Sequence, residues 1–114
     1  MLHAPSPEAS GSCEHQIHCS GSSARHNGQS ASFTALNGLS QQLLIRAALT
    51  DARAGLGTLM EAHGTGTGLG DPIEVSSIAA IAADSCRIFA IKGNMGHTES
   101  TAGVANVMEV ASLL

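Results

Sequence analysis

The chain has 114 residues, which is enough for one domain or for part of one. Its formal net charge is −4 at pH 7, and its five lysine and arginine residues occur singly, so it lacks the basic stripe that binds nucleic acid or an anionic membrane surface. No apolar run approaches the ~20 residues that span a bilayer, and the N-terminus lacks the basic and apolar regions of a secretory signal. We therefore expect a soluble cytoplasmic protein that binds neither nucleic acid nor a membrane.

The apolar residues predict a thin core. They make up 43% of the chain, but alanine is the commonest of them, and Phe33 and Phe89 are the only aromatic side chains. Alanine buries little area, so at roughly 25 cal/mol per Å² the hydrophobic stabilisation is smaller than the percentage suggests. This composition is typical of a fragment of a larger domain.

The first 16 residues show no periodicity, and we assign them no fold. Cys13, His15, His18 and Cys19 have the residue types and the short spacing of a zinc site. Four ligands in one short segment, without a second supporting segment, rarely build a structural site, so we expect no bound metal. Cys13, Cys19 and Cys86 cannot all pair, and reduced thiols are the expected state.

A helix is predicted from Asn37 to about Gly55, because apolar residues recur at helical spacing in NGLSQQLLIRAALTDA. The short run TLMEAH, residues 58–63, has glycine on both sides and predicts a buried strand with His63 at its carboxyl end. A glycine-rich loop follows. From Asn37 to the glycine-rich loop, the predicted order of elements is therefore helix, strand and loop.

The stretch DPIE predicts the start of a second helix. Asp71 is suited to the N-cap, Pro72 to the first helical position and Glu74 to a capping box. This helix is expected to continue to about Asp84. We assign Asp71 and Glu74 structural roles as caps.

A second buried strand, RIFAIK, is predicted at residues 87–92 and is followed by a short loop that carries His97. The last helix begins near Ser100 and continues to the end of the chain. One face of that helix is apolar, with Val104, Val107, Met108, Ala111 and Leu114.

The order strand, helix, strand, helix predicts an α/β protein with two parallel strands. Crossovers of this length place ligand chemistry at the carboxyl ends of such strands. His63 and His97 both follow a strand at that edge. We therefore expect the two imidazoles to face one cavity.

Two motifs resemble those of a known family. The sequences EAHGTGTGLGDPIEV and IKGNMGHTESTAGVANVMEV are similar to the two histidine motifs of β-ketoacyl synthases, and of polyketide synthase ketosynthase domains in particular. The stretch HNGQSASFTALNGLSQQLLIRAAL is similar to the family segment that precedes the first histidine. The resemblance covers residues 17–114, whereas residues 1–16 match no family that we recognise.

This resemblance implies part of a thiolase-like fold, a βαβα segment of its C-terminal half. It also implies acyltransferase chemistry, the decarboxylative Claisen condensation of acyl and malonyl thioesters in polyketide or fatty-acid biosynthesis. By the resemblance, His63 and His97 donate Nε2–H hydrogen bonds to the thioester oxygen, and Lys92 orders the site. Thr65 and Thr67 contact the phosphopantetheine arm of the partner acyl carrier protein, and no cofactor or metal is bound directly.

The resemblance also shows what the chain lacks. The family nucleophile is a cysteine in an upstream elbow, and none of the three cysteines here stands in that context. We therefore interpret the chain as the C-terminal portion of a ketosynthase that needs the missing N-terminal half and is inactive alone. The alternative is a non-catalytic remnant, or a binding surface, from a truncated gene. A cysteine elbow upstream in the reading frame would favour the enzyme.

Overall fold

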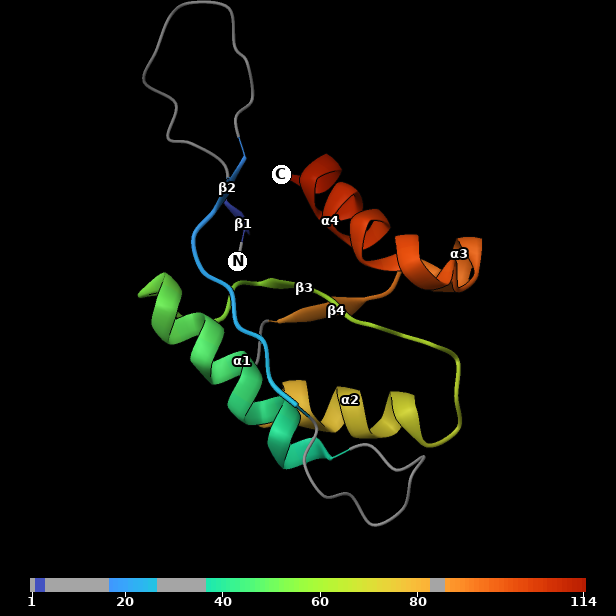
Figure 1. The fold of residues 1–114 in the computed structure, drawn as a ribbon, viewed down its shortest axis with the longest axis horizontal. Helices are drawn as coiled ribbons and strands as arrows, with labels where there is room; N and C mark the ends of the chain where they lie inside the picture. The colour runs from blue at the N-terminus through green and yellow to red at the C-terminus, as the bar shows by residue number, and fades with distance from the viewer. Residues whose placement is uncertain (1, 4–16, 27–36, 83–85) are drawn as a thin grey trace, which may run out of the picture.

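The computed structural model describes residues 2–3, 17–26, 37–82 and 86–114. Two short strands, β1 (Leu2–His3) and β2 (His18–Cys19), come first and are followed by α1 (Gly38–Ala52), β3 (Leu59–Glu61) and α2 (Gly70–Ala79). The remaining elements are β4 (Arg87–Phe89), α3 (Lys92–Met95), the 3-10 turn η1 (Glu99–Thr101) and α4 (Ala102–Leu113). In Figure 1 the strands β3 and β4 run through the middle of the molecule.

The strands β3 and β4 are parallel, as predicted, with Leu59 opposite Arg87 and Glu61 opposite Phe89. The hydrogen bond from the Ala62 N–H to the Phe89 carbonyl, 2.8 Å, extends this ladder by one step. Both strands are shorter than the predicted ranges 58–63 and 87–92. After Ile91 the backbone coils instead into α3, because the N–H groups of the next residues bond back to Ala90 and Ile91.

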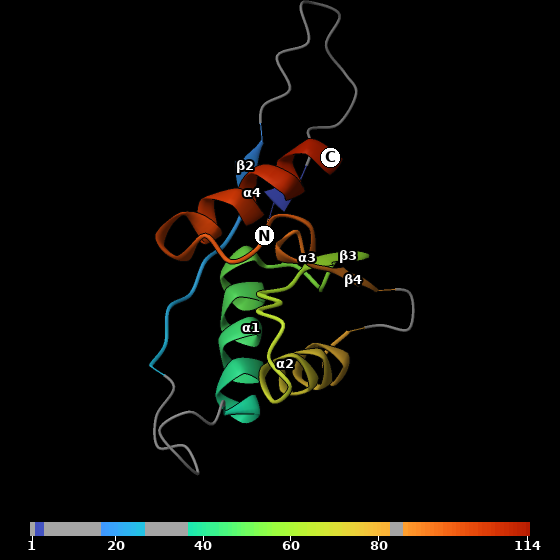
Figure 2. The same ribbon diagram turned by 90° about the vertical axis from the view of Figure 1, so that its right-hand side faces the viewer.

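Helices lie on both sides of this small sheet. Figures 1 and 2 show α1 and α2 on one side and α4 on the other. The helix α1 contacts α2 at Gly38, where the Ser77 hydroxyl donates to the Gly38 carbonyl at 3.2 Å. A side chain at position 38 would meet that hydroxyl at 3.0 Å, so glycine allows the close crossing.

The helix boundaries agree with the predictions at most ends. Asn37 caps α1 by accepting from the Ser40 N–H at 3.1 Å. The helix α2 ends at Ala79, earlier than predicted. The Ile81 N–H then bonds to the Ile78 carbonyl, only three residues back, which tightens the chain into a turn. The predicted end at Asp84 lies outside the described residues. The final helix follows η1, close to its predicted start at Ser100.

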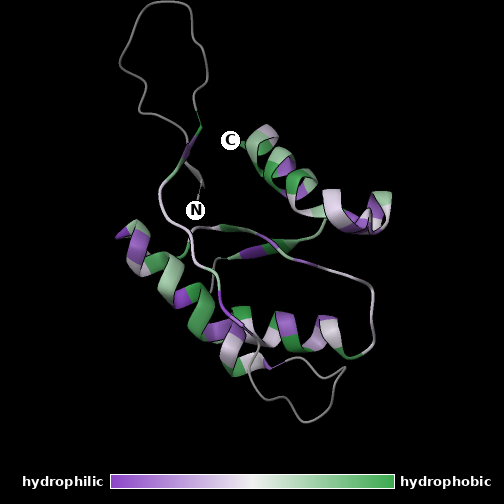
Figure 3. Cartoon of the chain, in the orientation of Figure 1, coloured by the Kyte–Doolittle hydropathy of each residue, from purple (hydrophilic) through white to green (hydrophobic). Residues whose placement is uncertain are grey.

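The core is as thin as the composition predicts. Within the described ranges, the buried hydrophobic side chains are those of Ala62, Ile78 and Ala102. Figure 3 shows apolar residues along α4, and the large hydrophobic side chains exposed there are Val104, Val107, Met108 and Leu113. The predicted apolar face of the last helix therefore exists, but no described element covers it. In the part of the chain that the structure describes, no helix is long and apolar enough to cross a membrane.

Residues 21 and 22, which follow β2, pack against α1. No fold is predicted for residues 1–16, yet Leu2–His3 form β1 and pair antiparallel with β2. The Ser22 N–H then donates to the Asp51 carboxylate at 3.0 Å. Next to it, Gly21 is buried, and a Cβ there would come within 2.5 Å of the Ala52 nitrogen. Glycine therefore permits this segment to lie on the helix.

Two of the four candidate zinc ligands lie outside the described residues. Cys13 and His15 lie outside the described residues, whereas His18 and Cys19 form β2. Within residues 2–3, 17–26, 37–82 and 86–114, no three His, Cys, Asp or Glu side chains gather as metal ligands.

Candidate functional site

The two motif histidines lie together at the carboxyl ends of the parallel strands. His63 follows β3, and His97 follows β4 and α3. Their ring centroids are 5.3 Å apart and the rings are nearly perpendicular, at 84°, so the imidazoles meet edge to face. Both residues are exposed in this chain. The predicted meeting of the two loops is therefore observed.

The loop after His63 depends on the absence of a side chain at Gly64. Gly64 has a φ of +51°, a left-handed conformation that most L-residues avoid. A Cβ there would also collide with the Cβ of Ala90, which lies at the end of β4. The loop can therefore cross closely over the neighbouring strand only with glycine at this position.

Asp71 and Glu74 hold this loop instead of capping α2, so the predicted roles are wrong. The Glu74 carboxylate accepts from the His63 N–H at 2.6 Å and from the Gly64 N–H at 2.9 Å. Both oxygens of Asp71 lie within 3.2 Å of the Gly66 nitrogen. Helical caps satisfy donors of their own helix, whereas these carboxylates satisfy donors of the preceding loop.

Thr67 accepts the hydrogen bonds of the backbone N–H groups in the first turn of α2. Its hydroxyl accepts from the Gly70 N–H at 3.1 Å, and its carbonyl accepts from the Asp71 N–H at 3.2 Å. The Thr65 and Thr67 hydroxyl oxygens are 3.2 Å apart, so one donates to the other. Because the pair has two O–H groups and this contact uses one, the other O–H can donate to a ligand.

His97 uses one ring nitrogen as a hydrogen-bond acceptor. Its Nδ1 accepts from the Glu99 backbone N–H at 2.9 Å. In a neutral imidazole one nitrogen accepts and the other carries the proton, so Nε2 of His97 is the donor. Glu99 has a φ of +48°, an uncommon left-handed conformation for a residue with a side chain.

Lys92 is buried, with 7% of its surface exposed. Its ammonium group donates to Oδ1 of Asn106 at 3.0 Å, and the Asn106 amide donates to the Ala62 carbonyl at 3.3 Å. Asn106 therefore links Lys92 to the residue before His63. In addition, the Glu61 carboxylate accepts from the Ile91 N–H at 2.9 Å and joins the ends of the two strands. Asn106 and Glu61 are not predicted from the sequence, because a residue that bridges two elements leaves no local pattern.

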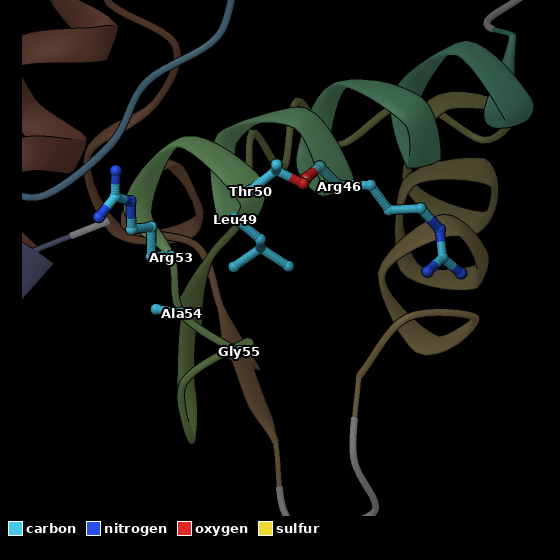
Figure 4. Close-up of a pocket in the computed structure, with 6 residues that line it drawn as sticks. All are labelled: Arg46, Leu49, Thr50, Arg53, Ala54 and Gly55. Atoms are coloured by element: carbon cyan, nitrogen blue, oxygen red, sulfur yellow. The ribbon is translucent and has the colours of Figure 1, made fainter.

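A groove of about 630 Å³ lies elsewhere, at the end of α1. Arg46, Leu49, Thr50, Arg53, Ala54 and Gly55 line it. The guanidinium groups of Arg46 and Arg53 point to opposite sides in Figure 4. Neither histidine borders this groove, so it is separate from the imidazole pair.

Gly64→Ala is expected to destabilise the fold by about 1–3 kcal/mol, because the new methyl group collides with Ala90 in addition to the left-handed strain. Gly68→Ala is the matched control, since a Cβ at Gly68 meets nothing within 4 Å. The measurement is urea unfolding of a complete ketosynthase that carries this segment. Equal stability of the two variants would contradict this view of the loop.

Comparison with known proteins decides the family. The model of the β-ketoacyl synthase C-terminal domain matches residues 17–114. The chain belongs to this family. The ketosynthase segment is 43% identical over 102 residues to the pikromycin polyketide synthase component PikAIII of Streptomyces venezuelae, an alignment that covers 82% of the chain and 6% of that protein. It is 44% identical over 102 residues to erythronolide synthase EryA3 of Saccharopolyspora erythraea, covering 82% of the chain and 3% of that relative.

A solved structure confirms the thiolase-like fold of this ketosynthase segment. The oxazolomycin ketosynthase domain OzmH KS7 of Streptomyces albus superposes with a TM-score of 0.73 at 34% sequence identity. The superposition covers 82% of this chain and 17% of the solved one. The segment therefore spans a small part of the ketosynthase domain and a still smaller part of the polyketide synthases that it matches.

Proposed function

We propose that this segment supplies the two histidines of a ketosynthase that performs decarboxylative Claisen condensation. The observation that carries the proposal is the edge-to-face contact between His63 and His97, with Nδ1 of His97 already bonded to the Glu99 N–H. A neutral imidazole held in this way presents an N–H donor to an approaching oxygen. A second N–H donor from the adjacent His63 imidazole would complete a site that is suited to an oxyanion that develops during reaction.

The chemistry requires a malonyl thioester and an acyl group carried by a cysteine outside this segment. The bond between the malonyl α-carbon and its carboxylate breaks, CO₂ leaves, and the electron pair passes to the thioester as an enolate. His63 and His97 donate to the enolate oxygen. The α-carbon then attacks the acyl carbonyl, a carbon–carbon bond forms, and the cysteine thiolate departs.

Lys92 and the threonines have supporting roles in this proposal. The buried ammonium of Lys92 contributes a positive charge beneath the histidine pair and orders the site through Asn106. The free O–H of the pair Thr65 and Thr67 can donate to the phosphopantetheine arm of an acyl carrier protein. The segment then needs no cofactor of its own, because the arm arrives on the carrier.

The test uses a hybrid ketosynthase, in which residues 17–114 replace the matching part of a polyketide synthase relative. This hybrid ketosynthase is expected to release CO₂ from malonyl carrier protein and to form the condensed product. If it becomes acylated and yet never decarboxylates malonyl carrier, the segment is a non-catalytic remnant.

The isolated chain, in contrast, is expected to form no acyl-enzyme. Cys86 precedes β4 and so lies at the strand end opposite the histidines, and Cys19 lies in β2. Because neither of the two described cysteines lies beside the imidazole pair, we expect the first half-reaction to have no acceptor. The measurement is protein-bound label after incubation with radiolabelled acyl carrier. Stable, hydroxylamine-sensitive labelling of Cys13, Cys19 or Cys86 would contradict the expectation.

A further inference from the structure

The helix α1 carries an exposed stripe with the spacing of a coiled-coil seam. Its members are separated by alternating steps of four and three residues, and they are Leu39, Leu43, Arg46, Thr50 and Arg53. Leu39 is 65% exposed and Leu43 is 44% exposed. This spacing keeps side chains in one line along a helix, which is the arrangement by which one helix packs against another. We call these residues the α1 stripe.

The two ends of the α1 stripe differ in chemistry. The end near the start of the helix is apolar, whereas the other end carries Arg46 and the C-cap residue Arg53. Their guanidinium groups point to either side of Leu49 in Figure 4, and neither has a carboxylate partner among the described residues. Two of the five lysine and arginine residues therefore stand on one helix face of a chain whose net charge is −4. An acidic partner is attracted at this face and repelled by the rest of the chain.

We propose that the α1 stripe docks an acidic amphipathic helix of a partner protein. Apolar side chains of that helix cover Leu39 and Leu43, and its carboxylates pair with the two arginines. The groove at the end of α1, which Leu49 and both arginines line, accepts one of its side chains. This inference does not depend on the proposed function, because neither motif histidine borders the groove.

A second copy of the chain fits the α1 stripe poorly. In a parallel pair of α1 helices, Arg46 would face Arg46 and Arg53 would face Arg53. In an antiparallel pair, the two Arg46 side chains would meet at the centre and each Arg53 would face Leu39. Like charges that face each other disfavour both arrangements. The rest of a ketosynthase domain is expected to cover the exposed apolar face of α4, which lies on the other side of the sheet in Figures 1 and 2.

The experiment measures binding of a synthetic helical peptide to the hybrid ketosynthase by fluorescence anisotropy. The peptide carries leucines and glutamates at alternating steps of four and three residues, and a second peptide has lysines in place of the glutamates. The glutamate peptide is expected to bind about tenfold more tightly than the lysine peptide. Raising the salt concentration should weaken its binding, since the charges are exposed.

Variants of the α1 stripe test each end of it. Arg46→Glu and Arg53→Glu are each expected to weaken binding of the glutamate peptide about threefold to tenfold, and the double variant should prefer the lysine peptide. Leu43→Gln should weaken both peptides, because it removes an apolar contact that they share. Arg87→Glu makes the same charge change on β4 and is the matched control, so it should bind like the parent. Circular dichroism checks that each variant keeps the helix content of the parent.

Three results would overturn the inference. The first is equal binding of the two peptides, and the second is glutamate-peptide binding that survives the double charge reversal. The third is binding of neither peptide, which would show that other parts of the domain cover the α1 stripe. If Arg46→Glu instead changes self-association in sedimentation, the stripe belongs to a second copy. None of these results bears on malonyl decarboxylation, so the proposed function is tested separately.

Discussion

Replacing His63 by alanine in the hybrid ketosynthase is expected to lower malonyl decarboxylation by about 10²–10³-fold, and the same change at His97 should have a similar effect. Each variant removes one N–H donor from the developing enolate oxygen, which raises the barrier by about 3–4 kcal/mol. Acylation of the cysteine should change little, since that step does not form this enolate. The measurement is labelled CO₂ release beside transfer of a labelled acyl group.

The two substitutions should not be additive. The rings contact one another with centroids 5.3 Å apart. When groups act as a unit, removing one of them loses most of the rate acceleration that they provide together. The double variant should therefore be little slower than the slower single variant. His26→Ala, which removes an imidazole from another part of the chain, is the control and should decarboxylate normally. A double variant slower by the product of the two single effects would show that the histidines act independently.

The isolated chain is expected to show no cooperative thermal unfolding. The described residues bury only three hydrophobic side chains, two of them alanines, whereas Leu39, Val104 and Met108 are each more than 60% exposed. The apolar area that is buried gives too little stabilisation to offset the conformational entropy lost on folding. The uncovered face of α4 should instead promote association.

Calorimetry and circular dichroism of a dilute sample test this expectation. The hybrid ketosynthase, in which we expect the rest of the domain to cover α4, is the control and should unfold in a sharp transition. A sharp, concentration-independent transition from the monomeric 114-residue chain would refute the expectation.

The sequence predicts the order and type of the main elements because these follow from local periodicity. The helical spacing in residues 38–52 and the apolar run before His63 each identify one element. The order of those elements then places His63 and His97 at the same edge of the sheet, where the parallel strands end. The helix α3 is missed, since its four residues lie directly after a strand and are too short to show a period.

The interactions that hold the site are harder to predict because they join distant segments. Asp71 and Glu74 match a cap pattern in sequence, and a cap or a loop anchor requires the same residue types. Only the three-dimensional path of the loop decides between the two roles. Asn106 lies mid-helix and has no sequence signal, although it connects Lys92 to Ala62, the residue after β3, through two hydrogen bonds.

The left-handed backbone at Glu99 limits which substitutions this position tolerates. Glycine reaches that conformation freely, and asparagine and aspartate reach it more readily than other residues, whereas valine or isoleucine would resist it. Proline would in addition remove the N–H that bonds Nδ1 of His97. Variation at a residue whose side chain takes no part in the chemistry can therefore exchange the donor and acceptor nitrogens of the neighbouring ring.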